Sequence, residues 1–215
     1  MPSMKSATHA VLTLSRRPAL LVAVLATVVL GTATLQAQHP TPASVPYRWE
    51  LNFKPGALRL YVDDEDGKAY WFMTYKVENR TGRDQVWAPR FTLFTDDGRI
   101  MQSGRDVATR VTADLLAILG NELMEDQNTI IGDLLHGREH AKDGLVIWPA
   151  RNLNVNRLSL FVAGISGESL KIKNPATGED VILRKTLQRD YLVRGDAGPR
   201  GSQELELATQ RWIMR

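Results

Sequence analysis

The sequence predicts an all-β fold, an antiparallel β-sandwich into which one amphipathic helix is inserted. Three observations support this prediction. In Ala69–Glu78 the side chains alternate between an apolar side and a side that grades from aromatic to charged, as they do along a strand. The second half of the chain contains short segments rich in β-branched residues and separated by Gly, Asn, Asp or Pro. Only the stretch 106–119 changes to a clear helical period.

Length and composition suit one folded domain. The chain has 215 residues, 43% of them apolar, which is enough for a sizeable core. The formal charge is +3, but Lys5, Arg16 and Arg17 precede Ala37 in a segment without acidic residues. The remaining 24 of the 27 basic residues balance 24 acidic residues, so nucleic acid is not an expected partner. The absence of cysteine excludes disulfides, thiolate metal ligands and a cysteine nucleophile.

Residues 1–37 predict a signal peptide. A basic start is followed by the uncharged run Pro18–Ala37, whose densest apolar part is shorter than the roughly 20 residues that span a membrane. We expect cleavage after Ala37 and release into the periplasm or the cell surroundings. An uncleaved helix over 18–37 that anchors the protein in the inner membrane is the alternative. Residues 38–46, with three prolines, predict an extended tether, and 47–215 predict the sandwich domain.

The first half of the domain predicts two hairpins. Arg48–Phe53 and Ala57–Val62 read as a β-ribbon that turns at Lys54-Pro55-Gly56. Ala69–Glu78 and Val86–Thr95 read as two long strands joined by a corner rich in Asn, Thr, Gly and Asp. We expect this second hairpin to form the centre of the sandwich.

A helix is expected after the central hairpin, with Asp106 as its N-cap and Gly120 as its end. Its apolar face would consist of Val107, Val111, Leu115, Ile118 and Leu119. A helix of about three turns is not stable alone, so it should cover the sandwich edge or dock on a partner.

The rest of the chain predicts strands at the spacing of a sandwich. The expected segments are Thr129–Leu135, Gly144–Trp148, Arg157–Gly164, Ser169–Ile172 and Asp180–Leu187, with a last strand or helix in Gln203–Met214. All five tryptophans fall within these predicted elements, which favours packing roles for them. They are Trp49, Trp71, Trp87, Trp148 and Trp212.

The segments YWFMTYKVENRTGRDQVWAPRFTLFTDDG, GLVIWP and RLSLFVAGISGE carry a resemblance. They resemble exported bacterial proteins of unassigned activity that contain immunoglobulin-like β-sandwiches, in which an aromatic strand ending in V-x-N precedes a turn and a second strand. The match covers about half of the chain, and its motifs are structural. It implies an immunoglobulin-like fold and an exported location, and it brings no catalytic or ligand-binding residues.

One motif suggests chemistry. His136, Glu139 and His140 match the H-x-x-E-H pattern of inverted zinc peptidases, in which a helix places both His on one face as zinc ligands and the Glu acts as general base. Gly137 within the motif and strand-like runs on both sides favour a charged loop instead. Two tripeptides carry weaker signals. Arg194-Gly195-Asp196 spells an integrin-binding sequence, and Asn79-Arg80-Thr81 is a formal glycosylation sequon.

The expected function is therefore non-catalytic: a binding or envelope-associated accessory domain whose loops or sheet edge engage a protein or glycan partner, without a cofactor. A zinc-dependent hydrolase built on His136, Glu139 and His140 is the second reading. A structural envelope component anchored through 18–37 is the third. The sequence does not predict a ligand, an oligomeric state or the order of the strands.

Overall fold

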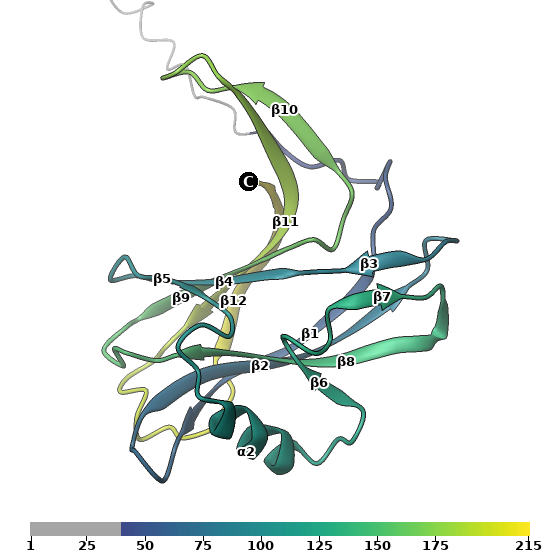
Figure 1. Ribbon diagram of the computed structural model, residues 1–215. Coiled ribbons are helices and arrows are strands. Elements are labelled where there is room, and N and C mark those ends of the chain that lie inside the picture. Colours follow the sequence, from purple (N-terminus) through teal and green to yellow (C-terminus); the bar gives the residue numbers. More distant parts are fainter. Residues whose placement is uncertain (1–39) are drawn as a thin grey trace, which may run out of the picture. The chain divides into compact units, whose positions relative to one another are not determined.

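Alternating apolar side chains give each strand one face to bury, and two sheets bury these faces against each other. The computed structural model describes residues 40–215, so the predicted signal peptide or anchor and the first two tether residues lie outside the described part (Figure 1). Strands make up 51% of the structure and the described residues contain one short helix, which confirms the all-β class. The described residues 40–215 belong to one compact unit.

The smaller sheet has the order β1-β2-β8-β6. Its strands are β1 (Asn52–Val62), β2 (Ala69–Asn79), β8 (Gly137–Pro149) and β6 (Met124–Asp126). β1, β2 and β8 pair antiparallel, whereas β6 runs parallel to β8.

The larger sheet has the order β10-β11-β9-β4-β5, and β12 pairs with the other edge of β11. Its strands are β4 (Arg90–Thr95), β5 (Ile100–Gln102), β9 (Arg157–Ala163), β10 (Ser169–Lys173), β11 (Asp180–Leu192) and β12 (Glu206–Met214). Two short strands, β3 (Gln85–Trp87) and β7 (Gly132–Leu134), form a separate pair.

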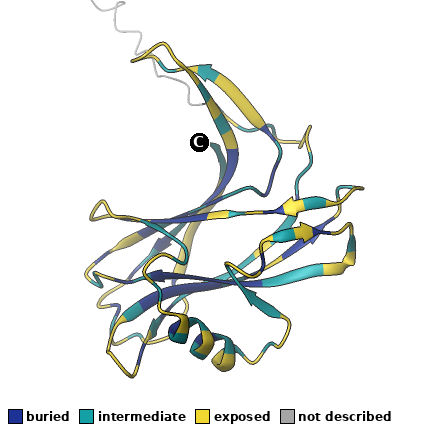
Figure 2. Cartoon of the chain, viewed as in Figure 1, coloured by how far each residue is buried: buried dark blue, intermediate teal, exposed yellow. Residues whose placement is uncertain are grey.

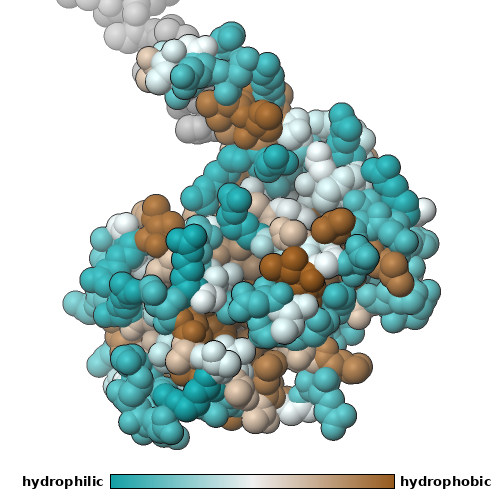
Figure 3. All heavy atoms as spheres, viewed as in Figure 1, coloured by the Kyte–Doolittle hydropathy of each residue, from teal (hydrophilic) through white to brown (hydrophobic). Residues whose placement is uncertain are grey.

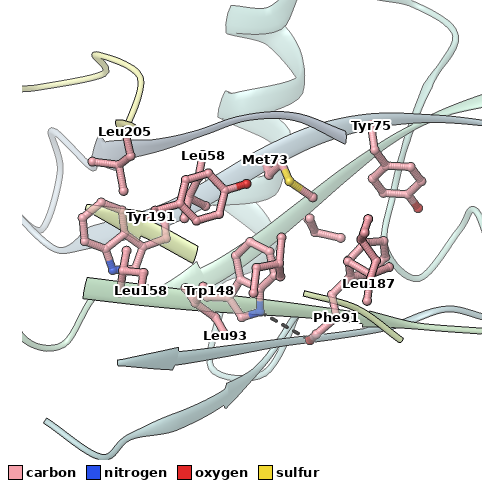
Figure 4. Packing of buried hydrophobic residues seen from close by; sticks show 14 of the residues in the cluster. Leu58, Met73, Tyr75, Phe91, Leu93, Trp148, Leu158, Leu187, Tyr191 and Leu205 are labelled. Carbon is pink, nitrogen blue, oxygen red and sulfur yellow. Dashed lines mark hydrogen bonds between the residues drawn. The ribbon is translucent and has the colours of Figure 1, made fainter. Parts of the chain in front are cut away.

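The core lies between the two sheets, where the inward faces of the strands are buried (Figures 2 and 4). Trp71, Met73, Tyr75 and Val77 supply the inward face of β2, as their alternation predicts. Each is at most 3% exposed. Burial of an aromatic or aliphatic side chain contributes about 1.5–3 kcal/mol, so this strand alone provides a large share of the core's stabilisation.

Helix α2 (Thr109–Leu119) covers the outer face of the smaller sheet rather than its edge (Figure 1). Val111 and Leu115 are buried there in a cluster that includes Tyr70 and Phe72 of β2. Two expectations were wrong. Asp106 does not cap the helix, since it has a positive φ and the N-cap is Ala108 without a side-chain bond. Ile118 is 67% exposed instead of packed. The helix ends at Gly120 in the left-handed conformation, as predicted.

The predicted central hairpin is wrong in its pairing. β2 belongs to the smaller sheet and β4 to the larger one, so the two segments face each other across the core instead of bonding side by side. Pro89 explains the break. It interrupts the segment between β3 and β4, has no N–H to donate and marks the point where the chain passes to the second sheet.

The predicted turn at Lys54-Pro55-Gly56 is also wrong, because β1 runs straight through it as one strand. The register with β2 shifts between Pro55 and Leu58, so this segment forms a bulge. A Cβ on Gly56 would lie 2.8 Å from the carbonyl oxygen of Thr74, so glycine is needed for close packing of the two strands.

β10 and the first half of β11 form a hairpin that extends beyond the sandwich, which we call the β10–β11 arm (Figure 1). Its residues Leu170 and Ile182 are 41% and 59% exposed, and apolar atoms are visible on this arm in Figure 3. Tether residue Ala43 is held at the base of the arm, where its N–H donates to Glu168 Oε1 at 2.8 Å.

Within residues 40–215, no helix has the length and the hydropathy that a membrane crossing requires.

Candidate functional site

A cavity of about 980 Å³ opens where the chain enters β1 and passes beside β11 and β12. We call it the Trp49 cleft. Its walls come from four parts of the chain: residues 46–53, the turn after β2, the connection between β9 and β10, and the inward faces of β11 and β12. Ligand pockets in proteins have volumes of roughly 300–1,000 Å³, so this cleft has room for a small-molecule-sized ligand.

Backbone pairing holds the entry segment in place. The N–H of Leu51 donates to the carbonyl of Ile165 at 2.9 Å, and the N–H of Gly167 donates to the carbonyl of Trp49 at 2.9 Å. The indole of Trp49 then lies directly over Gly167, where a Cβ would be 2.4 Å from its Nε1 atom. Any larger residue at position 167 would push the indole away, so glycine there allows the Trp49 ring to keep this orientation.

Aromatic side chains line the cleft. Tyr47 is 62% exposed, and Trp49, Phe53 and Trp212 are partly exposed. Phe53 also packs against the core, with its ring centroid 5.3 Å from that of Tyr75 and 6.0 Å from that of Phe91. Since Trp49, Phe53 and Trp212 pack against the core, their rings form a rigid apolar surface that is partly open to solvent.

Arginines form the polar part of the lining. Arg80 makes two bonds to Glu78, of 2.6 and 2.8 Å, and holds the pKa of that carboxyl below its usual value. Arg48 and Arg83 have no ion-pair partner within residues 40–215. The cleft thus presents two uncompensated positive charges beside its aromatic rings.

A buried ion cluster supports one wall. Lys185, only 2% exposed, places its Nζ 2.9 Å from Glu50 Oε2, 3.4 Å from Glu168 Oε2 and 4.9 Å from the ring centroid of Trp212. Burial lowers the pKa of Lys185, but the two carboxylates outweigh burial, so the net shift is upward. Lysine therefore stays charged and ties Glu50 and Trp212 to the sheet.

The lining of the cleft consists mainly of groups that bind a ligand by stacking and by charge. The cleft lining includes one carboxylate, Glu50, and that group is already engaged by Lys185. A nucleophile within hydrogen-bond reach of a base, the usual signature of covalent catalysis, does not occur among the residues that line the cleft. Rings for stacking and guanidinium groups for anions are what the cleft offers.

The H-x-x-E-H segment lies elsewhere, at the start of β8, and it is a strand where the sequence favoured a loop. Residues 137–140 belong to β8, where Gly137 pairs with Asn79 and the register then shifts, and His136 precedes the strand, with its N–H donating to Asp84 Oδ1 at 2.8 Å. Four residues along a strand span about 13 Å, whereas four residues of the peptidase helix span about 6 Å. His136 and His140 are therefore not held one helical turn apart, as the two zinc ligands of the peptidases are. Residues 40–215 contain no group of three His, Asp or Glu arranged to hold a metal.

The two tripeptides have local structural roles. Arg194 bonds both carboxylate oxygens of Glu206, at 2.5 and 2.9 Å, so its guanidinium is already engaged. Asn79 is fully buried, and its side-chain amide donates to the carbonyls of Arg83 and Leu134. The amide nitrogen of this sequon therefore belongs to the turn that follows β2.

Sequence reasoning missed the cleft because it assigned all five tryptophans to packing. Trp71, Trp87 and Trp148 are at most 1% exposed and confirm this assignment in full. Trp49 and Trp212 also pack against the core, but they are partly exposed and line the cleft as well. Their separation by more than 160 positions hides the site, although the alternation of Tyr47, Trp49 and Phe53 up to the start of β1 was a usable signal. Comparisons with protein-family models, curated proteins and solved structures found no match to this chain.

Proposed function

We propose that this protein is a non-catalytic binding domain and that its Trp49 cleft holds an acidic glycan. The main observation behind this proposal is that aromatic rings and arginines line the same cleft. Trp49, Trp212 and Tyr47 are partly exposed there. Arg48 and Arg83 have no ion-pair partner among residues 40–215. Large side chains with rigid rings and unpaired guanidinium groups are the kinds of residue that dominate binding sites.

Each part of the cleft matches a part of such a ligand. The C–H face of a sugar ring is apolar and flat enough to stack on an indole or phenol ring. A uronic-acid carboxylate accepts two parallel hydrogen bonds from one guanidinium, which gives both energy and orientation. Because Gly167, Lys185 and Tyr75 contact Trp49, Trp212 and Phe53 respectively, these three rings lose little ordering entropy on binding.

The test is calorimetric titration of residues 40–215 with short uronic-acid oligosaccharides and with neutral oligosaccharides of the same length. We expect acidic oligosaccharides to bind and Arg83→Ala to weaken binding about 10- to 100-fold, since a charge-assisted hydrogen bond contributes roughly 1.5–3 kcal/mol. Tyr47→Ala, a change at an exposed ring, should weaken both affinity and binding enthalpy. Arg105→Ala removes an exposed arginine outside the cleft and should leave affinity unchanged.

Equal binding of acidic and neutral oligosaccharides, or equal affinity of Arg83→Ala and Arg105→Ala, would contradict the proposal. Binding of an acidic peptide through the same residues, with no oligosaccharide binding, would replace the glycan by a protein partner.

We further propose that the sandwich is immunoglobulin-like. The order β1-β2-β8 in one sheet and β11-β9-β4-β5 in the other supports this proposal. It corresponds to strands A-B-E and G-F-C-C′ of that fold, taken in chain order. β6, β10, β12 and α2 would then be additions to the shared strands.

Export to the periplasm or the cell exterior is part of the same proposal and rests on residues 1–37. Anchoring through 18–37 is the alternative location. The intact mass of the protein isolated from its native host tests both: a start near Gln38 supports cleavage, and retention of residues 18–37 supports the anchor.

A further inference from the structure

A second, smaller groove lies on the outer face of the larger sheet. It has a volume of about 220 Å³, and its lining includes Arg90 from β4, Phe161 from β9, Arg184 from β11 and Arg215 after β12. We call it the arginine groove. The Trp49 cleft uses Leu187 and Trp212, which are paired on the inward face of β11 and β12. Thr186, which directly precedes Leu187 in β11, faces the arginine groove. The two cavities therefore lie on opposite faces of the same strands.

Two of the three arginines are directly opposite each other. The N–H of Arg184 donates to the carbonyl of Arg215 at 2.7 Å, and the N–H of Arg215 donates back at 3.1 Å. Side chains of such a pair lie on one face with Cβ atoms about 5.5 Å apart. Like charges placed directly opposite destabilise a sheet, and Arg90 adds a third positive charge to the same groove.

Side-chain carboxylates of the described residues do not offset this repulsion. Arg90, Arg184 and Arg215 form no ion pair there, in contrast to Arg59 and Arg194, which pair with glutamates. Asp190 shares the outer face, but its oxygens already accept bonds from Ser159 at 2.6 Å, Gln188 at 2.9 Å and Thr209 at 2.8 Å. An anion from outside would relieve the repulsion.

The groove is also preorganised. Arg215 stacks over Phe161, with its guanidinium carbon 4.1 Å from the ring centroid. The floor is formed by Thr92 and Thr186, which are 5% and 3% exposed. Their hydroxyls already donate to Gln102 Oε1 and to the carbonyl of Arg184, so the arginines are the donors available to an anion. A guanidinium held against an aromatic ring keeps its planar set of donors in one orientation, which suits bidentate contact with an oxyanion.

We propose that the arginine groove binds a tetrahedral oxyanion, a sulfate or a phosphate group, either free or as a monoester. The volume is below the roughly 300 Å³ of the smallest typical ligand pockets, so one such group fits better than a larger molecule. Three guanidinium groups around one site match the oxygens of a tetrahedral anion. This site is independent of the glycan proposed for the Trp49 cleft.

The test is calorimetric titration of residues 40–215 at constant ionic strength in chloride with inorganic sulfate, inorganic phosphate, glucose 6-phosphate and glucose. We expect the oxyanions to bind and glucose not to bind. Tighter binding of glucose 6-phosphate than of free phosphate would identify an ester as the ligand, and the reverse order would identify the free ion. Arg184→Ala and Arg90→Ala should each weaken binding at least 10-fold.

Arg157→Ala is the matched control, because Arg157 is an exposed arginine at the far end of β9 on the same face. It removes the same charge and should change affinity less than twofold. Thermal unfolding gives a second readout: without anion, Arg184→Ala should melt no lower than the original protein, since a repulsive pair is lost. No oxyanion binding, or equal loss in Arg157→Ala and Arg184→Ala, would overturn the proposal.

Discussion

At the scale of single residues, Asn79 shows how one side chain can close a turn that the backbone alone leaves unpaired. Its Nδ2 donates to the carbonyls of Arg83 at 2.9 Å and Leu134 at 2.8 Å, and its Oδ1 accepts from the N–H of Thr81 at 3.0 Å. The side chain thereby joins the end of β2 to β7 as well as shaping the turn. The sequence indicated turn chemistry here, but the contact with Leu134 crosses 55 positions and has no local signature.

Asn79→Ala should lower the free energy of unfolding by about 2–4 kcal/mol, because it leaves buried polar groups without partners. Asn174→Ala is the matched control. Asn174 makes the same side-chain bond to an N–H two residues on, at 2.9 Å, but in an exposed turn. It should cost less than about 1 kcal/mol. Urea unfolding measures both, and equal losses would show that burial of Asn79 does not matter.

Asp63 predicts a pH dependence. Arg110 donates to both of its carboxylate oxygens and holds the pKa of Asp63 well below its ordinary value of 3.8. A carboxyl whose pKa is lower in the folded state stabilises the protein above its unfolded pKa, and this contribution is lost as the pH falls through the folded pKa. The difference in Tm between the original protein and Asp63→Asn should therefore be largest above about pH 4 and should shrink towards pH 2.

Glu65→Gln is the control for this measurement. Glu65 also contacts Arg110, at 2.7 Å, but its side chain is 70% exposed. Its effect on Tm should be small at every pH. A constant difference between the original protein and Asp63→Asn from pH 7 to pH 2 would show that the ion pair is not the cause.

At the scale of elements, helix α2 depends on packing against the sheet. Leu115→Ala should lower the free energy of unfolding by about 2–5 kcal/mol, because Leu115 is 1% exposed among Tyr70, Phe72 and Leu145. Ile118→Ala, one turn later and 67% exposed, should change it by less than about 0.5 kcal/mol. Denaturant unfolding compares them. A large loss in Ile118→Ala would mean that the helix packs with another face.

The elements also show where sequence patterns fail. Alternation located β2, and Gly120 located the end of α2, because these signals are local. Pro55-Gly56 and Pro89 were ambiguous: either one can end a strand, bend it or move it to another sheet. Which of these happens depends on the partner strand, and that partner is distant in sequence. The pairing of β2 with β8 across about 70 positions was out of reach for the same reason.

At the scale of the whole molecule, the sequence predicted the all-β class but not the cleft. The Trp49 cleft and the arginine groove are each assembled from segments that are far apart in the chain. The arginines and tryptophans that line them look like ordinary surface and core residues when they are read one at a time. Only the pairing of β11 with β9 and β12 brings them together.

The most direct test of the central claim is the two-dimensional ¹H–¹⁵N spectrum of residues 40–215 during titration with acidic oligosaccharides, because each of the five tryptophans has its own indole N–H signal. If the Trp49 cleft is the binding site, the signals of Trp49 and Trp212 shift together with increasing ligand, and those of buried Trp71, Trp87 and Trp148 stay in place. Shifts of the buried indoles without those of Trp49 and Trp212, or no shifts at saturating ligand, would contradict the account.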